Sequence, residues 1–234
     1  AQVRCVLLGG APLADELLRE ALALGYPIAP TYGMSEAASQ VATCPPGQLP
    51  ATGAPWLSSL PGTQIRIAPL AGHGECGEIQ VRGPTLMRGY LAPDGSCHSP
   101  LRDGWLATGD LGRQNASGRL QVRGRVDDLI ISGGENLYPL EIETVLQQHP
   151  AVALACVVPR SDPEYGQRPV AFWTGSPGAG ATARELAAFC RARLGGLKVP
   201  MAFYRVDSLP RSATGKLLRG QLRERAKNSP GFAK

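Results

Sequence analysis

The sequence predicts a mixed α/β and α+β fold. The end of a large mixed or parallel-sheet domain is followed by a β-rich, barrel-like subdomain and then by a small α+β domain. Three observations predict this order. The chain begins with a strand–helix–strand pattern, its middle consists of short alternating runs between Gly, Pro, Asp and Asn turns, and helical and strand patterns alternate again from residue 128 onward.

The N-terminal segment is predicted to be a βαβ unit. VRCVLLGG, residues 3–10, is an apolar strand-like run that ends in two glycines. Pro12 suits the first turn of a helix, and apolar residues then recur at helical spacing until Gly25. A second strand follows at YPIAPTYG, residues 26–33, so the two strands should be parallel. Because strand-like sequence starts at Ala1, we expect the chain to hold only the last part of a larger sheet.

Residues 45–125 are predicted to be β-rich. The runs TQIRIA (63–68), GEIQVRG (77–83) and RLQVRGR (119–125) alternate between apolar and polar residues. Short strands of this kind are typical of a barrel or a sandwich. GHGECG, residues 72–77, matches the dinucleotide-binding pattern G-x-G-x-x-G. A strand follows it where that pattern requires a helix, so we predict a hairpin loop there.

The last part of the chain is predicted to be a compact α+β domain. Pro139 starts one helix, and Thr182 with Glu185 forms a capping box ahead of another. A basic helix ends the chain. We expect the boundary at residues 125–127, which gives domains at 1–124 and 128–234. The strand-like runs of the second domain are DLIIS (128–132), VALACVV (152–158), RPVAFW (168–173) and AFYRVD (202–207).

Composition indicates a reduced, cytoplasmic globular protein. No uncharged apolar run approaches the ~18 residues that a membrane-spanning helix needs, and no basic-then-apolar leader is found. The six cysteines are scattered without a C-x-x-C pair, which favours free thiols. A zinc site built from His73, Cys76, Cys97 and His98 would match no standard spacing, so we expect no zinc.

The net charge of +5 lies wholly in residues 128–234. From Arg211 onward there are seven basic residues and a single acidic one. A basic helix can bind nucleic acid, but no aromatic residues are interleaved with this one and no base-reading motif accompanies it, so we predict no nucleic-acid partner. The basic residues either face solvent or favour a small polyanion such as ATP or coenzyme A.

Two local motifs suggest other functions. GMSEA, residues 33–37, places Ser35 just after a strand, as in the nucleophile elbow of a serine hydrolase, although the final Gly of that motif is missing. The structural alternative is that Ser35 caps a helix. PRSATGKLLRG, residues 210–220, contains the T-G-K of a phosphate-binding loop. Pro210 and Leu217 occupy the positions of its first Gly and of its Mg²⁺-binding hydroxyl, so this is not that loop.

Four segments taken together, in order, resemble the adenylate-forming acyl-CoA synthetase superfamily. They are YGMSEAAS (32–39), GWLATGDLG (104–112), GRVDDLIISGGENLYPLEIE (124–143) and LPRSATGKLLR (209–219). The resemblance covers nearly the whole chain. Within the superfamily, YGMSEAASQVAT and YGQRPVAFW are most similar to the o-succinylbenzoate–CoA ligases of menaquinone biosynthesis. Synthetases for other aliphatic or aromatic acids, and more remotely a serine hydrolase, are the alternatives.

The resemblance implies an ATP site in the first part of the chain. Asp110 matches a carboxylate that accepts hydrogen bonds from both ribose hydroxyls, and Arg125 matches a contact to ribose and phosphate. Glu36 matches the Mg²⁺-binding carboxylate, and Ser35 supplies a hydroxyl for the phosphate where Thr is more common. Tyr32 would pack on the base. The further positions implied to contact ATP or AMP are Gly9, Gly10, Ala11, Pro12 and Gly33.

The resemblance also implies a mobile C-terminal domain that carries the catalytic residue Lys216. Asp127 would be the hinge, Gly133 and Gly134 would line a tunnel for the pantetheine of coenzyme A, and Tyr165 would contact its nucleotide. The implied activity joins a small carboxylate to coenzyme A with ATP and Mg²⁺, releasing AMP. Neither the acid nor the oligomeric state follows from the sequence, and a homo-oligomer is one alternative. The family's phosphate loop would precede this chain, so we expect a piece of a longer enzyme with little activity by itself.

Overall fold

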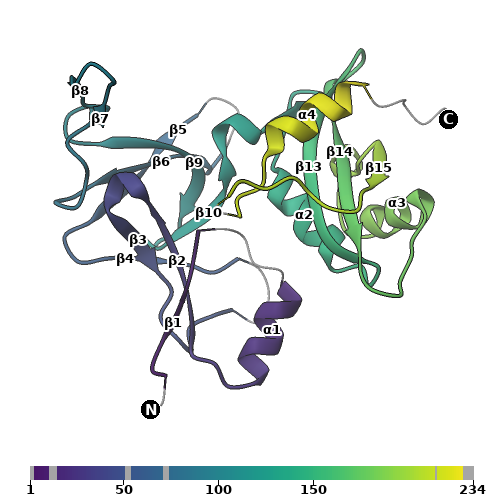
Figure 1. The fold of residues 1–234 in the computed structure, drawn as a ribbon, viewed down its shortest axis with the longest axis horizontal. Helices are drawn as coiled ribbons and strands as arrows, with labels where there is room; N and C mark the ends of the chain where they lie inside the picture. The colour runs from purple at the N-terminus through teal and green to yellow at the C-terminus, as the bar shows by residue number, and fades with distance from the viewer. Residues whose placement is uncertain (1–2, 11–14, 51–53, 71–73, 214, 229–234) are drawn as a thin grey trace. The chain divides into compact units, whose positions relative to one another are not determined.

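The computed structural model describes residues 3–10, 15–50, 54–70, 74–213 and 215–228 (Figure 1). The chain forms two compact units, whose main parts are Arg19–Val126 and Asp127–Lys234. The boundary between them falls within residues 125–127, and the hinge function of that segment stays a prediction. None of the described helices is long and apolar enough to cross a membrane. Three residues with sequence-based predictions, Ala11, Pro12 and His73, lie outside the described residues.

The first sheet contains the predicted βαβ unit. Its elements are β1 (Val6–Leu8), α1 (Asp15–Ala23), β2 (Ile28–Met34), the 3-10 turn η1 (Ser35–Ala37), β3 (Ser39–Thr43) and β4 (Ser58–Ser59). β1 and β2 are parallel, and Gly25 ends the helical segment between them with a φ of +79°. β3 and β4 continue the sheet antiparallel, which gives the order β1-β2-β3-β4.

The β-rich segment forms a second sheet of antiparallel strands, as its alternating pattern predicts. The strands are β5 (Gln64–Pro69), β6 (Gly77–Arg82), β9 (Leu106–Gln114) and β10 (Leu120–Arg125), and the short β7 (Tyr90–Leu91) and β8 (Cys97–His98) form a separate hairpin. Their order is β10-β9-β6-β5, so this sheet is open. β5 and β6 pair antiparallel, so the described residues of GHGECG, 74–77, lead directly into a strand and not into a helix. Ile79 and Leu120 pack with Val41 of the first sheet in one apolar core.

The second unit is a five-stranded sheet with helices packed on both faces. Its elements, after the 3-10 turn η2 (Val126–Asp128), are β11 (Ile130–Ser132), β12 (Glu135–Leu137), α2 (Pro139–Gln147), β13 (Val152–Asp162), β14 (Gly166–Gly175), α3 (Ala183–Arg191), the 3-10 turn η3 (Gly196–Lys198), β15 (Ala202–Arg205) and α4 (Arg219–Asn228). The path β12-β11-β14-β13 is antiparallel, and β15 joins β14 in parallel. The predicted Thr182–Glu185 capping box is present.

The strands of this unit alternate between two apolar cores. Val157 of β13 packs in a cluster with Leu146 of α2 and Leu186 of α3. The neighbouring Cys156 packs in a second cluster with Leu222 of α4. Because successive side chains of a strand point to opposite faces, α2 and α3 cover one face of the sheet and α4 covers the other. Figure 1 shows α4 and the two longest strands, β13 and β14, in this unit.

Burial should protect some of the six thiols, all of which are free. Desolvation raises the pKa of Cys156 to about 12 and that of Cys190 to about 11. At pH 8 both thiols are therefore protonated, and only the thiolate is nucleophilic. We expect iodoacetamide at pH 8 to alkylate the exposed Cys5 and Cys97 well before Cys156 and Cys190. Peptide mapping by mass spectrometry measures the order, and early modification of either buried thiol would contradict it.

Candidate functional site

The Asp110 carboxylate on β9 brings three predicted residues together. Its Oδ2 accepts a 2.7 Å hydrogen bond from the Tyr32 hydroxyl on β2, and its Oδ1 accepts a 2.9 Å bond from Arg125 Nη1 at the end of β10. The Asp110 side chain is only 16% exposed. Both carboxylate oxygens thus have partners in the first unit, and these partners fix the orientation of the carboxylate.

The backbone before Asp110 is shaped to admit Arg125. Thr108 Oγ1 accepts the Asp110 N–H at 3.1 Å and donates to the carbonyl of Ile79 at 2.8 Å, which holds the backbone where the β6–β9 pairing shifts register. Gly109 has a φ of +71°, and a Cβ at this position would lie 3.0 Å from Arg125 Nη2. Because a side chain would strain the backbone at this φ and crowd the guanidinium, glycine is favoured at this position.

Tyr32 holds its proton at physiological pH. Burial first, and then the charge of Asp110, raise the pKa of the Tyr32 phenol far above its usual value. The hydroxyl therefore acts as a permanent donor to Asp110. The ring packs against the apolar core beneath the first sheet. Packing of Tyr32 on a nucleotide base stays a prediction. The hydrogen bond from its hydroxyl to Asp110 was not predicted from the sequence.

A cavity of about 500 Å³ opens at the ends of β1 and β2. The predicted residues Gly9, Gly10, Gly33 and Ser35 all line it. A Cβ on Gly33 would lie only 1.9 Å from the carbonyl oxygen of Ser39, so no other residue fits there without moving the backbone. The β2–β3 pairing also shifts register between residues 32 and 33. The structure thus gathers four sequence-predicted residues around one opening.

Ser35 lies in the turn of a β-hairpin. β2 and β3 flank the 3-10 turn in antiparallel pairing, so the strand-to-helix elbow of a serine hydrolase is not formed here. The interpretation of Ser35 as a helix cap is also wrong, because Met34 occupies the N-cap position and no side-chain cap hydrogen bond is made. Both interpretations required an α-helix after Ser35, but only the 3-10 turn η1 forms there before β3 begins.

Glu36 is positioned from two sides. Its Oε1 accepts a 2.9 Å hydrogen bond from the Tyr90 hydroxyl, and its carbonyl accepts the Met87 N–H at 2.8 Å. The hydrogen bond to Glu36 raises the pKa of Tyr90. One carboxylate suits Mg²⁺ where phosphate oxygens and water complete the coordination, so Glu36 fits that role. In the part of the chain that the structure describes, no cluster of three or more His, Cys, Asp or Glu side chains could hold a metal.

Lys216 lies in the second unit, in a tight turn before α4. The Ser212 N–H donates to the Lys216 carbonyl at 2.8 Å, and the Lys216 N–H donates to Ser212 Oγ at 3.2 Å. Gly215 has a φ of +83°, and its carbonyl accepts a 2.6 Å bond from Arg211. Lys216 itself is exposed. The turn is closed by its own hydrogen bonds and is unlike a glycine-rich phosphate loop.

The residues predicted to contact coenzyme A also lie together in the second unit. Gly133 and Gly134, with φ of +55° and +82°, form the turn between β11 and β12. The Gly133 N–H donates to the Tyr165 carbonyl at 2.9 Å, and a Cβ on Gly133 would lie 3.1 Å from the Tyr165 ring. The ring therefore packs on the turn. The Arg168 guanidinium lies 5.2 Å from the centroid of the Tyr165 ring.

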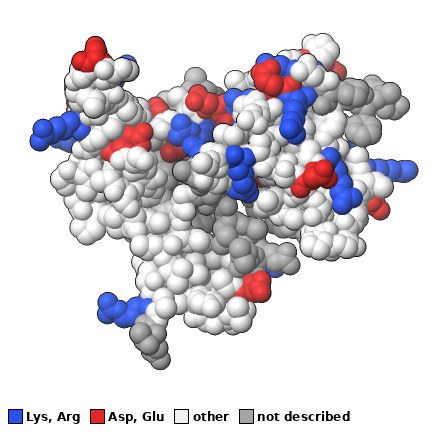
Figure 2. Space-filling model, viewed as in Figure 1, with Lys and Arg blue, Asp and Glu red and all other residues white. Residues whose placement is uncertain are grey.

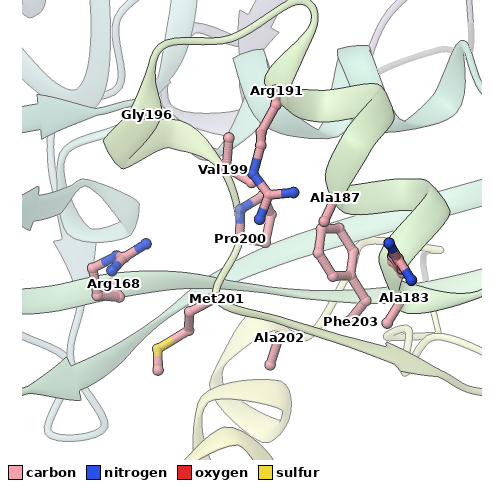
Figure 3. A pocket seen from close by; sticks show the side chains of 11 residues that line it. Arg168, Ala183, Ala187, Arg191, Gly196, Val199, Pro200, Met201, Ala202 and Phe203 are labelled. Carbon is pink, nitrogen blue, oxygen red and sulfur yellow. The ribbon is translucent and has the colours of Figure 1, made fainter. Parts of the chain in front are cut away.

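A second cavity, of about 620 Å³, lies between α3 and β15 and was not predicted from the sequence (Figure 3). Arg168, Arg184 and Arg191 line it, and Val199, Pro200, Met201, Ala202 and Phe203 give it an apolar side. Positive charge beside apolar surface suits an anion with an apolar portion. The sequence signal that could have indicated this cavity is the spacing of Arg184 and Arg191, which lie seven residues apart on one helix face.

A buried ion pair in the second unit was also missed. The Arg219 guanidinium bonds Glu143 with two nitrogens, Nη1 to Oε1 at 2.5 Å and Nη2 to Oε2 at 2.8 Å, and Glu143 also accepts the Val157 N–H at 2.6 Å. Burial alone would lower the pKa of Arg219, but the hydrogen bond and the charge of Glu143 outweigh it and raise the pKa. The prediction that the basic residues of the terminal helix face solvent or a polyanion is therefore wrong for Arg219.

On the face shown in Figure 2, basic side chains are interspersed with acidic ones.

Comparisons with known proteins define the class of this chain. Residues 1–91 match the family of AMP-binding enzymes, and residues 141–216 match the AMP-binding enzyme C-terminal domain. The chain therefore belongs to the adenylate-forming AMP-binding enzymes. It is 43% identical to the 2-succinylbenzoate–CoA ligase of Bacillus velezensis, over 95% of this chain and 46% of the relative. It is 41% identical to that of Bacillus subtilis, over 96% and 46%.

Solved structures show the same likeness. The o-succinylbenzoate CoA synthetase (MenE) from Bacillus subtilis, in complex with the acyl-adenylate intermediate OSB-AMP, has a TM-score of 0.84 and 39% identity, over 99% of this chain and 47% of that one. ATP-bound MatB from Rhodopseudomonas palustris has a TM-score of 0.85 and 31% identity, over 96% and 46%. The chain spans about half the length of the relatives it matches.

Proposed function

We propose that this chain is the C-terminal part of an ATP-dependent, AMP-forming carboxylate–CoA ligase, with 2-succinylbenzoate as the acid. The observation that carries the proposal is the Asp110 carboxylate held by Tyr32 and Arg125 in a member of this family. Relatives at 41–44% identity are named 2-succinylbenzoate–CoA ligases, which supports the choice of acid. On the same ground we propose a place in menaquinone biosynthesis and in the cytoplasm.

In the first half-reaction, an oxygen of the substrate carboxylate attacks the α-phosphorus of ATP. The bond from this phosphorus to the bridging oxygen breaks, and pyrophosphate leaves. The Lys216 ammonium would stabilise the charge that develops on the phosphoryl oxygens. Asp110 would hold the ribose, and Ser35 would donate to a phosphate. Mg²⁺ bound through Glu36 and the ATP phosphates would supply positive charge to the leaving pyrophosphate.

In the second half-reaction, the thiolate of coenzyme A attacks the acyl carbon. The bond from this carbon to the AMP oxygen breaks, AMP leaves with the electron pair, and the thiol proton passes to solvent. We propose that the second unit turns about Asp127 between the two half-reactions. This motion would withdraw Lys216 and bring the Gly133–Gly134 turn beside the pantetheine. A single positive charge on a long flexible side chain suits a group that must arrive and leave.

Ribose binding by Asp110 can be tested on the 234-residue chain itself. Asp110→Asn keeps the shape of the side chain but removes its charge, so charge-assisted bonds to the ribose are weakened. We expect the Kd for AMP, measured by calorimetry, to rise about tenfold or more, since each such bond contributes ~1.5–3 kcal/mol. Asp94→Asn makes the same change in the exposed β7–β8 hairpin and serves as the control. Equal AMP affinity in both variants would contradict ribose binding by Asp110.

The arginine-lined cavity is the best candidate for the phosphates of coenzyme A. Arg168 both lines this cavity and stacks on Tyr165, which connects it to the predicted tunnel residues. We expect Arg191→Ala to raise the KM for coenzyme A about tenfold, through loss of a charge-assisted bond to phosphate, with adenylation unchanged. Arg193→Ala is the matched control, because that guanidinium stacks on Phe189 instead. An unchanged KM for coenzyme A would exclude this cavity.

The ligase activity is tested by joining the chain to the upstream part of the Bacillus subtilis relative. This completed enzyme should release pyrophosphate from ATP with 2-succinylbenzoate, and far less with simple aliphatic or aromatic acids. Preference for another acid would contradict 2-succinylbenzoate as the substrate. If no acid caused pyrophosphate release, the proposed ligase activity would be contradicted. The chain by itself should form little acyl adenylate, and efficient formation would contradict the expectation that an upstream phosphate loop is needed.

A further inference from the structure

Two arginines of α4 bind one carboxylate next to the boundary between the units. Arg219 Nε lies 3.3 Å from Asp128 Oδ2, and Arg223 Nη2 donates to Asp128 Oδ1 at 2.7 Å. Arg223 Nη2 also donates to the carbonyl of Asp127 at 2.5 Å. The two arginines are four residues apart and therefore lie on one face of the helix. Helix α4 is thus attached to η2 through both the side chain and the main chain.

The start of the same helix is anchored in the interior of the second unit. Besides its two bonds to Glu143, Arg219 Nη1 donates to the carbonyl of Val157 at 3.0 Å. The side chains of Arg219 and Glu143 are 18% and 4% exposed. A guanidinium held in two parallel bonds to a buried carboxylate has little freedom to rotate or shift. Leu222, one turn further along, is fully buried and holds the helix against the sheet.

Lys216 is carried on the residues just before this anchored helix. The turn around it is closed by the bond from the Gly215 N–H to the Ser212 carbonyl at 2.9 Å. The Leu218 N–H donates to the Pro210 carbonyl at 2.9 Å, which joins the two arms of the turn. Only two residues, Leu217 and Leu218, lie between Lys216 and Arg219. Little unconstrained backbone therefore lies between the catalytic lysine and the anchored start of α4.

We propose that Arg219, Arg223 and Asp128 form a clamp that makes the Lys216 turn and the first residues of the second unit one rigid body. The inference rests on the proposed function. A rotation of the backbone at Asp127 can place Lys216 accurately only if the residues that connect the two move as a rigid unit. Arg223 and Asp128 are then positioning residues, which act through Lys216 without touching the substrate.

Hydrogen exchange on the 234-residue chain tests the clamp without any assay of activity. Asp128→Asn and Arg223→Gln each break it but leave the Arg219–Glu143 pair, and with it the core, in place. We expect amide exchange at residues 215–216 and 126–130 to rise about tenfold, because local opening becomes easier there, while β13 and β14 keep their protection. Lys227→Gln, the same change in the exposed pair with Glu224, is the control. Unchanged exchange at residues 215–216, or an equal rise throughout the unit, would overturn the clamp.

A double-mutant cycle with Lys216 then separates positioning from general weakening. In the completed enzyme, Asp128→Asn should slow adenylation by about 10- to 100-fold, because misplacement by ~1 Å can cost ~100-fold. In a Lys216→Ala background the same substitution should have no further effect. Losses that multiply would contradict a role through Lys216. If the unsubstituted enzyme does not adenylate at all, the proposed function fails, while the exchange measurement still decides whether the clamp exists.

Discussion

Replacing Lys216 by alanine is expected to slow adenylation in the completed enzyme by ~100-fold or more, as the loss of a preorganised charge at a transition state does. Thioester formation from supplied acyl adenylate should continue, because under the proposed mechanism Lys216 acts only in the first half-reaction. Pyrophosphate release measures the first step, and single-turnover formation of acyl-CoA measures the second. The exposed position of Lys216 means that the substitution leaves the fold intact.

Two further variants make this result specific. Lys227→Ala removes another exposed lysine, from α4, and should leave both half-reactions unchanged. Lys216→Arg keeps the charge but replaces a compact ammonium by a planar guanidinium, so we expect only partial activity. Equal losses in both half-reactions of the alanine variant would show that Lys216 serves the whole enzyme rather than adenylation.

Replacing Arg219 by methionine is expected to lower the free energy of unfolding by about 3–5 kcal/mol, the cost typical of breaking a buried ion pair from one side. The Glu143 side chain is only 4% exposed, and the substitution would leave its charge without the guanidinium. Urea denaturation of the 234-residue chain, followed by a probe in the second unit, measures the loss. Lys227→Met at the exposed pair should change stability little.

The double variant Arg219→Met/Glu143→Gln identifies the cause of this loss. Glutamine is neutral and can still accept the Val157 N–H that Glu143 accepts. If the unpaired charge is what destabilises the single variant, the double variant should recover much of the lost free energy, since removing both charges is far less costly than removing one. A double variant as unstable as the single one would assign the effect to lost packing around Arg219 instead.

Local patterns predicted most of the fold. The alternation in GEIQVRG, the capping box at Thr182 and the proline that begins α2 act within a few residues, and each produced the expected element. Ser35 shows the limit of such patterns. Its position after a strand suggested an elbow or a cap before a helix, but pairing between β2 and β3 places it in a hairpin turn, and pairing of that kind depends on the tertiary structure.

The candidate site was predicted from ordered motifs, yet its internal contacts were not. Nothing near Tyr32 in the sequence indicates that its hydroxyl meets Asp110, because the two lie on strands of different sheets. Glu143 and Arg219 are likewise 76 positions apart. Both residue types are usually exposed, and only the three-dimensional pairing makes their burial tolerable. Side-chain partners of this kind become visible only once the strands and helices have been placed.

The contacts of Asp110 have a thermodynamic consequence. Tyr32 and Arg125 already hold both of its oxygens, so its rotamer is selected when the chain folds. A ribose would meet an acceptor that loses little further freedom on binding, and its hydroxyls would contribute mainly enthalpy. Removing the phenolic oxygen with Tyr32→Phe would return some of that freedom. The weaker binding of AMP would then appear in calorimetry as a less favourable entropy of binding.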